Sequence, residues 1–528
     1  MDNRFYFGFN TSEERKKRRK AELYSMSEQV STFFWDEAPQ HGLEMREGQQ
    51  DMSFEIVDAL INDQHFAIEA GVGIGKSFGY LVPVLLYSKR MNKPVIIATS
   101  TIALQEQLWR DVHAVMPLLG LNRDVILAKG QTHYLCNKRE DEYMCDPKAD
   151  PPDALKEGIQ QGYEERKDFP EVLPQGVWDK VNVQRFSMKN CGSCEKKCKY
   201  YKVRAALKFT DGVVLCNQDF LTQHLMKLRR GQEGLINAAA DLLVVDEAHN
   251  LDDKVRSATT ERFGQGMLFG MIKSAFYELR SFDQSSVSGE KREAESAIIA
   301  FYNCLKAQVQ KQINEAEQNM RYADRFFFDN NGSAIELLTE MNAAIHNLSS
   351  SIQIYSSMDF RNNRSFAASD DLDAVSESLS ELLDQIDDML IWIEQHGSNT
   401  ELVYCPKNTK EIVSRLYFNG DERTILTSAT LTNATSGSLE EQYSYFICNT
   451  GFPAGDRGCL SEPKPSPYPY DEHAMIYYCD DLPHPTREHE AFIEKGVERL
   501  LEILSISNGK ALVLFTAKTD MEEVYSIL

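Results

Sequence analysis

Apolar residues in the first half of the chain form short continuous runs, which predict buried strands. In Leu242-Leu243-Val244-Val245 every position is apolar, as expected for a strand of a parallel sheet that is covered on both faces. Similar runs predict strands at residues 65–70, 95–99, 125–128, 213–216, 242–246 and 424–428. Because segments with helical spacing separate them, the pattern predicts an α/β domain with a parallel sheet.

The region between residues 251 and 414 has a different pattern. Three sets of apolar residues recur at steps of three and four, which is the spacing of one face of a helix. The sets are Ile298, Tyr302, Leu305, Val309 and Ile313; Leu338, Met341, Ile345, Leu348 and Ile352; and Leu372, Val375, Leu379, Leu382, Ile386, Met389 and Ile393. We therefore expect an all-helical, antiparallel bundle, with the last set on one long helix.

The length and composition indicate a protein of several domains. A chain of 528 residues, 42% of them hydrophobic, is too long for one core and is expected to form about three or four domains. No run approaches the ~18 apolar residues of a membrane span. Residues 1–20 lack the apolar core of a signal peptide. The sequence therefore predicts a soluble, cytoplasmic protein without a membrane partner.

The net charge of −23 weakens nonspecific binding to nucleic acid, although a strand can still bind in a locally basic groove. The densest charge run, at residues 13–20, is interpreted as the solvated face of a helix rather than as a nucleic-acid arm. The eleven cysteines indicate reduced thiols and metal ligation, because cytosolic redox buffers keep disulfides open.

A glycine-rich segment follows the first expected strand and precedes a helix: Ala70-Gly71-Val72-Gly73-Ile74-Gly75-Lys76-Ser77. Glycine at positions 71, 73 and 75 allows backbone amides to approach phosphate oxygens. Lys76 is expected to place its charge between the outer phosphates, and the Ser77 hydroxyl to ligate Mg²⁺. Ala70 stands where the general pattern has glycine. The segment therefore predicts an ATP and Mg²⁺ site.

A pair of acidic residues follows the apolar run that ends at Val245, in the sequence Asp246-Glu247-Ala248-His249. The carboxyl end of a parallel strand is where such sheets bind ligands. Asp246 is expected to hold the magnesium, and Glu247 to polarise the water that attacks the outer phosphate. Together with the glycine-rich segment, this predicts an enzyme that hydrolyses ATP.

Four cysteines lie between these two motifs: Cys136, Cys191, Cys194 and Cys198. The last three are close enough in sequence to share one short loop. Four thiolates suit a [4Fe-4S] cluster and equally suit a tetrahedral zinc ion, so the spacing alone leaves both open. Cys145 is a spare cysteine nearby.

The order of these features resembles the DinG/XPD family of iron-sulfur superfamily 2 DNA helicases, with the bacterial DinG type closest. In that family a cysteine-ligated cluster interrupts the first motor domain between the phosphate loop and the acidic strand end. Smaller segments match in the same order. They are Arg46-Glu47-Gly48-Gln49, Val95-Ile96-Ile97-Ala98-Thr99-Ser100-Thr101, Lys129-Gly130-Gln131-Thr132-His133-Tyr134-Leu135, Ile425-Leu426-Thr427-Ser428-Ala429-Thr430-Leu431 and Ser466-Pro467-Tyr468-Pro469-Tyr470.

The resemblance implies roles for particular residues. Gln49 is expected to read the adenine edge, and His249 to link the nucleotide site to the rest of the motor. The segment ending Thr99-Ser100-Thr101 is expected to touch the DNA backbone, for which hydroxyls and helix amides are suited. Family position favours a [4Fe-4S] cluster over zinc, with the cluster acting as a structural wedge at the fork.

The resemblance also implies a domain plan, which follows the chain in five parts. Residues 1–45 are an N-terminal extension; residues 46–130, 201–250 and 415–440 form the first RecA-like motor domain; residues 131–200 form the Fe-S domain; residues 251–414 form the helical Arch; and residues 441–528 begin a second RecA-like motor domain. Lys510-Ala511-Leu512-Val513-Leu514-Phe515-Thr516 is expected to be its first strand. Because no motif resembling the family's arginine fingers follows, we expect a truncated family member that does not unwind DNA alone.

The expected function is ATP-dependent unwinding of DNA, acting on single-stranded DNA and DNA forks in repair or replication. A 5′ to 3′ polarity is implied only by the resemblance. Two other functions remain open. One is a nucleotide-gated DNA-binding protein or inactive fragment without strand separation. The other is a zinc-stabilised nuclease or repair scaffold, although no acidic nuclease constellation precedes the motor.

Overall fold

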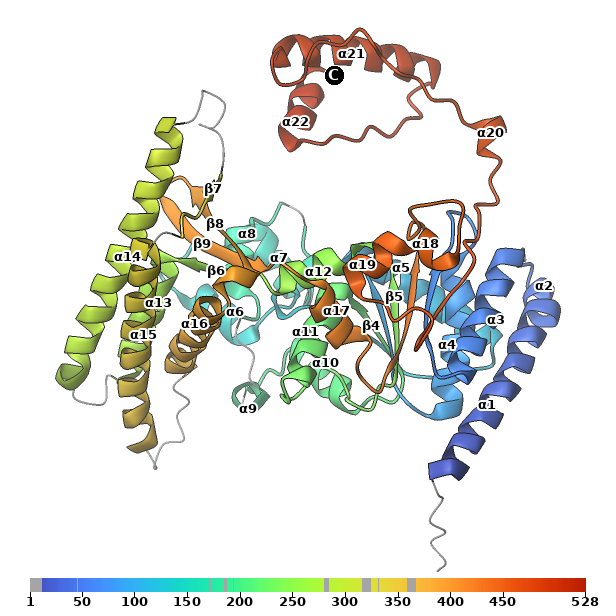
Figure 1. Ribbon diagram of the computed structural model, residues 1–528, viewed down its shortest axis with the longest axis horizontal. Helices are drawn as coiled ribbons and strands as arrows, with labels where there is room; N and C mark the ends of the chain where they lie inside the picture. The colour runs from blue at the N-terminus through green and yellow to red at the C-terminus, as the bar shows by residue number, and fades with distance from the viewer. Residues whose placement is uncertain are drawn as a thin grey trace, which may run out of the picture. The chain divides into compact units, whose positions relative to one another are not determined.

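The computed structural model describes residues 12–44, 46–170, 172–184, 188–192, 194–279, 284–315, 324–330, 332–358 and 367–528. The chain divides into two compact units, Met1–Pro467 and Tyr468–Leu528 (Figure 1). None of the helices in these described ranges is long and apolar enough to cross a bilayer.

A seven-stranded sheet organises the first unit. Its strands are β1 (His65–Glu69), β2 (Val95–Thr99), β3 (Val125–Leu127), β4 (Val213–Asn217), β5 (Leu242–Asp246), β10 (Arg423–Ser428) and β11 (Gly458–Leu460). Every neighbouring pair in the order β11-β1-β10-β5-β2-β4-β3 is parallel. All six predicted strands are confirmed. The apolar runs do not predict β11, because it has three residues and begins with glycine.

Helices cover both faces of this sheet, as the continuously apolar strands require. On β2, Val95 and Ile97 belong to the core that contains residues of α3 (Glu47–Ile61), α4 (Lys76–Met91) and α5 (Ile102–Leu118). The alternate residues Ile96 and Ala98 face the other core. That core contains residues of α10 (Lys199–Phe209), α11 (Gln218–Arg229), α12 (Leu251–Ala258), α17 (Lys410–Tyr417) and α19 (Ser444–Thr450). A short helix, α18 (Leu439–Gln442), precedes α19.

The N-terminal segment packs into the same core. Helix α1 (Ser12–Thr32) continues through a π-helical turn, η1 (Phe33–Glu37), into the short α2 (Ala38–Gln40). Leu23, Met26 and Val30 of α1 are buried with residues of α3 and α4. Lys17, Arg18 and Lys20 are exposed, which agrees with a solvated helix face at that charge run. The segment expected as an extension thus contributes a helix to the first domain.

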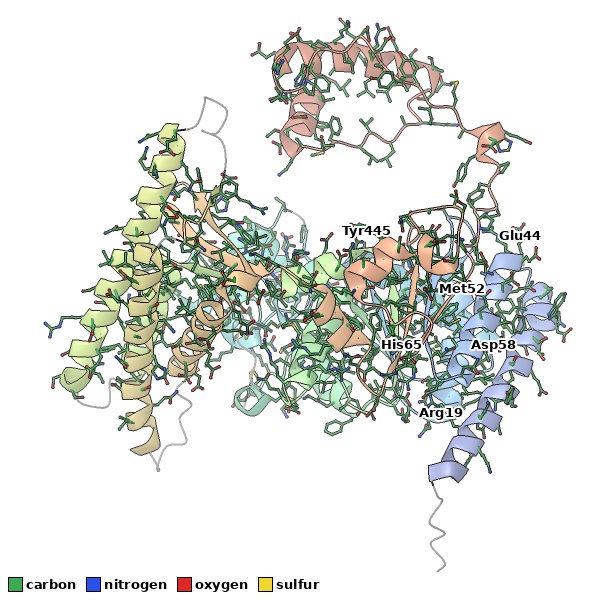
Figure 2. The ribbon with its side chains drawn as sticks, in the orientation of Figure 1. Arg19, Glu44, Met52, Asp58, His65 and Tyr445 are labelled. Atoms are coloured by element: carbon green, nitrogen blue, oxygen red, sulfur yellow. The ribbon has the colours of Figure 1, made fainter. Side chains whose placement is uncertain are left out.

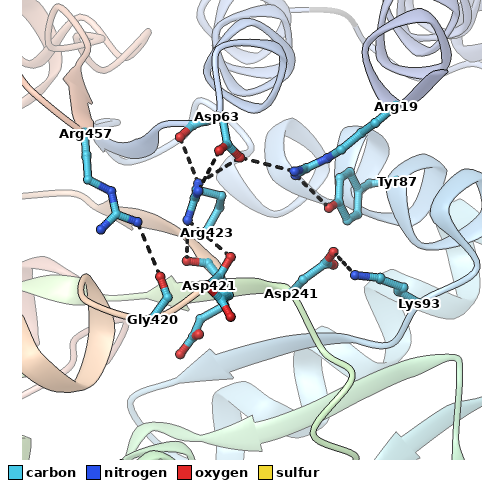
Figure 3. Close-up of polar contacts among 10 residues, drawn as sticks. Arg19, Asp63, Tyr87, Lys93, Asp241, Gly420, Asp421, Arg423 and Arg457 are labelled. Carbon is cyan, nitrogen blue, oxygen red and sulfur yellow. Dashed lines mark hydrogen bonds and ion pairs between the residues drawn. The ribbon is translucent and has the colours of Figure 1, made fainter. Parts of the chain in front are cut away.

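Hydrogen bonds between polar residues connect the amino-terminal ends of β1 and β10 to neighbouring segments (Figure 3). Arg423, at the start of β10, donates from Nη2 to Asp63 Oδ2 at 2.7 Å and from Nε to the Asp63 carbonyl at 2.8 Å. Arg19 of α1 also donates to Asp63, at 3.2 Å. Nearby, His65 (labelled in Figure 2) contacts the Phe418 carbonyl through Nε2 at 3.1 Å. Burial, followed by the charge of Arg423, lowers the pKa of His65 to about 4, so this histidine is neutral.

The cysteine-containing insertion forms a small helical domain with its own core. Its helices are α6 (Asn137–Cys145), α7 (Asp153–Gln160), α8 (Gln175–Val181) and α9 (Met188–Cys191). Leu135, Leu155, Phe169, Leu173, Trp178 and Val181 are buried together. Single bridges join Tyr134 to Glu165 and Leu135 to Asn182, so the chain entering at Leu135 is held between two later segments.

The region expected as an all-helical bundle contains a sheet as well as helices. Its helices are α13 (Gln265–Glu278), α14 (Ser288–Glu315), α15 (Gly332–Met358) and α16 (Ala367–Asp384). An antiparallel sheet of order β6-β9-β8-β7 is built from β6 (Glu261–Gly264), β7 (Arg325–Phe327), β8 (Met389–His396) and β9 (Asn399–Pro406). The expectation of an all-helical Arch is therefore wrong.

The error lies in the last apolar set. Leu372, Val375, Leu379 and Leu382 lie on α16 and are buried, but Met389 and Ile393 belong to strand β8. A step of four residues keeps a side chain on one face of a helix and also on one face of a strand, so the two patterns coincide there. A turn at Gly397, with φ of 61°, joins β8 to β9 as a hairpin.

The second unit is helical and has a small core. It contains α20 (Tyr470–His473), α21 (His489–Ile506) and α22 (Lys518–Ile527), with Ile493, Val497 and Val524 buried between the last two. The strand expected at residues 510–516 is not formed. A strand requires a hydrogen-bonding neighbour, and within the described part of this unit there is no other strand. Leu512 and Leu514 are accordingly 87% and 85% exposed.

Candidate active site

The glycine-rich segment is the turn between β1 and α4. Gly73 and Gly75 have φ of 91° and 85°, a left-handed conformation that glycine adopts without steric cost. At Gly71 an added Cβ would lie 2.7 Å from the backbone nitrogen of Ser466. The Gln49 amide donates to the Gly75 carbonyl at 2.9 Å. This bond uses one of the two hydrogens of the amide nitrogen.

The catalytic residues expected from the sequence meet at the carboxyl ends of β1 and β5. Lys76 Nζ lies 3.2 Å from Glu247 Oε1, and the Tyr80 hydroxyl donates to Asp246 Oδ2 at 3.4 Å. Burial is the main cause that raises the pKa of Asp246 to about 6; Glu247 adds to the shift and Lys76 opposes it. The charge of Lys76 thus partly offsets the cost of ionising this buried carboxyl group.

Two further polar residues belong to this site and were not expected from the sequence. Asp111 of α5 hydrogen-bonds to Ser77, and its pKa is raised mainly by burial. Gln218, the first residue of α11, is buried and donates to the carbonyls of Asp246 and Glu247 at 2.7 and 3.1 Å. Neither stands in a recognisable motif.

Glu247 has a left-handed backbone, with φ of 56°. A non-glycine residue in this region costs about 1–3 kcal/mol, and such residues concentrate at functional sites. The two bonds from Gln218 and one from the Glu247 N–H to Asp246 Oδ1, at 3.0 Å, hold the strained turn. This conformation directs the Glu247 carboxylate toward Lys76.

The acidic strand end is connected to the Ser428-Ala429-Thr430 segment, which begins at the last residue of β10. His249 Nδ1 lies 2.6 Å from Ser428 Oγ. Ser428 Oγ also donates to Glu247 Oε2 at 3.3 Å. The hydroxyl of Ser428 therefore contacts both residues. A movement of Ser428 would change the hydrogen bond that Glu247 accepts.

A second connection was not predicted. Glu69, the last residue of β1, accepts from the backbone N–H of Leu431 and of Thr432, both at 2.6 Å, and from Thr432 Oγ1 at 2.9 Å. The Glu69 N–H donates to the Tyr443 hydroxyl at 2.8 Å. The strand that leads into the phosphate loop is thus clamped to the loop that follows β10.

The segment expected to touch DNA is partly engaged within the protein. Thr99 is buried at the end of β2. Thr101 is the N-cap of α5, and its hydroxyl accepts from the Leu104 N–H at 3.2 Å. Ser100, in contrast, is partly exposed.

The four expected cysteine ligands line one cavity of about 660 Å³, together with Arg139, Lys196 and Tyr201. Burial raises the pKa of Cys198, and the neighbouring Cys136 and Cys191 raise it further. Cys145 is exposed and lies outside the cavity lining. Within the described residues, no three Cys, His, Asp or Glu side chains are placed so that they could hold a metal ion. The set of thiols nevertheless has the chemistry that thiolate-binding metals require.

Comparisons with known proteins find sequences similar to this chain. A family model described as DEAD_2 matches residues 131–266. The probable ATP-dependent helicase YpvA of Bacillus subtilis is 24% identical over 94% of this chain and 75% of its own length. A protein of the same organism named 3′-5′ exonuclease DinG is 25% identical over 92% of this chain and 56% of its own length. The ATP-dependent DNA helicase YoaA of Escherichia coli is 30% identical over 43% of this chain and 36% of its own length.

A parallel sheet with a phosphate loop after its first strand and a DEAH sequence after β5 defines the motor domain of a superfamily 2 helicase. The family model and these relatives support a similarity to the DinG-type helicases of that superfamily. The chain spans three quarters of the first relative and about half of the second, at 75% and 56% of their lengths.

Proposed function

We propose that this chain carries the ATP-hydrolysing motor of a helicase that unwinds DNA at single-stranded regions and forks in repair or replication. The observation that carries the proposal is the contact series from Lys76 through Glu247 and Ser428 to His249. It joins the phosphate loop, the acidic strand end and the loop after β10 in one polar network. Relatives named as ATP-dependent helicases support the assignment. The 5′ to 3′ polarity is proposed from family resemblance.

In the proposed reaction, Ser77 and Asp246 would hold Mg²⁺, which when bound neutralises charge on the phosphates. The phosphates compete with Glu247 for the charge of Lys76, because the two side chains are ion-paired at 3.2 Å. When Lys76 turns to the phosphates, the Glu247 carboxylate can take a proton from the attacking water. The water oxygen then bonds to the outer phosphorus as the bond to ADP breaks.

Two substitutions separate binding from hydrolysis. Lys76→Ala should weaken MgATP binding, because it removes the cation beside the phosphates. Glu247→Gln should keep binding and slow hydrolysis by about 10²- to 10⁴-fold, as expected for a lost general base. Nucleotide affinity and phosphate release are measured on the same preparations.

Matched controls are Lys89→Ala, an exposed lysine in the last turn of α4, and Glu411→Gln, an exposed residue of α17. If Glu247→Gln hydrolysed ATP at the parental rate, water activation would belong to another residue.

A strand-displacement assay completes the test. ATP-dependent DNA binding without displacement would favour a nucleotide-gated DNA-binding protein.

We further propose that Cys136, Cys191, Cys194 and Cys198 hold a [4Fe-4S] cluster, with zinc as the alternative. What supports this is their shared cavity, which brings Cys136 close to a segment more than fifty positions away. Bonds from the four thiolates to the cluster would link these segments, so that residues 131–200 form a rigid wedge beside the motor.

The cluster is tested by anaerobic purification followed by visible absorption and metal analysis. Cys194→Ser should remove or destabilise the iron chromophore and loosen residues 136–200 while nucleotide binding persists, because Lys76 and Asp246 lie outside that domain. Cys145→Ser is the matched control and should keep the chromophore. A colourless parent protein that contains zinc would contradict the iron assignment.

A further inference from the structure

An open cavity near the edge of the motor sheet lies beside β3 and is separate from the proposed nucleotide site. It has a volume of about 810 Å³ and is lined by residues of β3, α5, α10 and the turn at residues 165–167. Its floor is apolar: Val125, Ile126 and Leu127 are each partly exposed there. Trp109 of α5 also lines the cavity, and 40% of its surface is exposed.

The edge of β3 that faces away from β4 has no partner strand. β3 is the terminal strand of the sheet, and β4 is its only neighbour in the described part of the chain. The Val213 N–H donates to the Asp124 carbonyl and the Ala128 N–H to the Leu215 carbonyl, each at 2.7 Å. In a parallel pair, alternate residues bond the same neighbour. The backbone groups of Val125 and Leu127 therefore point outward, as hydrogen-bonding groups for an added strand.

The rim of this cavity is positively charged, although the whole chain carries −23. Arg110, Lys167, Lys199 and Lys202 line it, against two carboxylates, Glu106 and Glu165. Both carboxylates are already neutralised. Lys129, which is buried, lies 2.7 Å from Glu106 and 3.0 Å from Glu165. Lys167 and Lys199 make further ion pairs with them. An incoming ligand thus meets surplus positive charge.

We propose that this edge binds an extended acidic segment of a partner protein, which adds to the motor sheet as a strand beside β3. The outward amide and carbonyl groups of Val125 and Leu127 match the backbone of an extended peptide. Carboxylates on that peptide meet the cationic rim, and an apolar side chain contacts Trp109. Single-stranded nucleic acid fits less well, because it has no backbone amides and is usually bound by several stacked aromatic rings. Among the described residues, Trp109 is the one aromatic residue that lines this cavity.

The probe is a fluorescein-labelled peptide of about nine residues that alternates aspartate with leucine or phenylalanine, long enough to span β3. It is titrated into the full chain and followed by anisotropy. The double variant Arg110→Glu, Lys202→Glu should weaken binding by at least about tenfold, equal to about 1.4 kcal/mol. The exposed Lys89→Glu on α4 is the matched control and should bind as the parent does.

A second peptide tests the strand geometry without altering the protein. It has the same sequence with alternate amides N-methylated, which removes the donors that β3 would pair while keeping the charge. We expect it to bind at least about tenfold more weakly than the parent peptide. Equal binding of the two peptides would overturn strand addition. Tighter binding of oligothymidylate than of the acidic peptide, with loss in the same double variant, would instead assign the cavity to nucleic acid. ATP hydrolysis is recorded in parallel, because failure of the motor proposal leaves the peptide result unaffected.

Discussion

Asp246 shows how a single residue is prepared for its task by the fold. The strand that carries it is apolar and buried, so the carboxylate lies where ionisation is costly. Burial, with a smaller contribution from Glu247, raises its pKa to about 6 despite the opposing charge of Lys76. In the proposed role of Asp246, a bound cation would favour the charged form of this carboxyl group.

The raised pKa predicts a pH dependence of nucleotide binding. Protonated Asp246 cannot ligate a cation, so Mg²⁺-dependent ATP affinity should fall as the pH decreases from about 7.5 to below about 6. The measurement is nucleotide affinity at several pH values, with and without Mg²⁺. Asp246→Asn should bind weakly throughout and lose the pH dependence over this range. An unchanged pH profile in that variant would show that another group is responsible.

At the residue scale, what could be predicted depended on how far apart the interacting residues are in the sequence. Lys76, Ser77, Asp246 and Glu247 stand in local motifs, and the structure brings them together. Glu69 could not be found in this way, because its partners Leu431 and Thr432 lie more than 360 positions away. Its signal was only an acidic residue at the end of an apolar run, and an acidic residue is common where a buried strand emerges into solvent.

At the scale of elements, β10 illustrates why the strands of the sheet could be predicted, whereas the ion pair at the start of β10 could not. Its interior holds the apolar pair Ile425 and Leu426 between two threonines, and the strand was expected at nearly its observed position. Arg423, in contrast, begins the strand and donates to Asp63 through Nε and Nη2. Burial raises the pKa of Asp63, but hydrogen bonds and charge from Arg423 and Arg19 outweigh it and leave the pKa below its ordinary value.

Arg423→Met should destabilise the first unit by about 1–3 kcal/mol, a range typical of a buried group left without its hydrogen bonds. The lower end of that range is expected, because Asp63 is 53% exposed and solvent screens the pair. A carboxylate with a lowered pKa stabilises the fold above its unfolded pKa, and this contribution is lost as the pH falls through the folded value. The difference between the parent and the variant should therefore shrink below about pH 4.

Urea unfolding at several pH values measures this difference. Arg457→Met is the control, because its guanidinium makes one bond to the Gly420 carbonyl, at 3.3 Å. A variant as stable as the parent at neutral pH would mean that the Asp63 contact contributes nothing.

At the scale of the whole molecule, the two units differ in how much apolar surface they bury. The first unit has cores on both faces of a seven-stranded sheet and contains the residues proposed for the nucleotide site. In the second unit only Ile493, Val497 and Val524 are buried as a group, while Ile476, Leu512 and Leu514 are more than four fifths exposed. Because stability follows apolar burial, the second unit should open far more easily than the first.

This difference predicts the pattern of amide hydrogen exchange along the full chain. Amides of α21 and α22 should exchange at least about 100-fold faster than those of β5, since local opening needs little free energy where few apolar contacts are lost. Peptide-level exchange followed by mass spectrometry measures both regions in one sample, and α3, an exterior helix of the first unit, controls for helical position. A chain ending at Pro467 should likewise keep the parental affinity for MgATP, because the phosphate loop, its neighbour Ser466 and the DEAH segment all remain. Equal protection of α22 and β5 would show that the second unit is held by contacts far more extensive than its three buried residues provide.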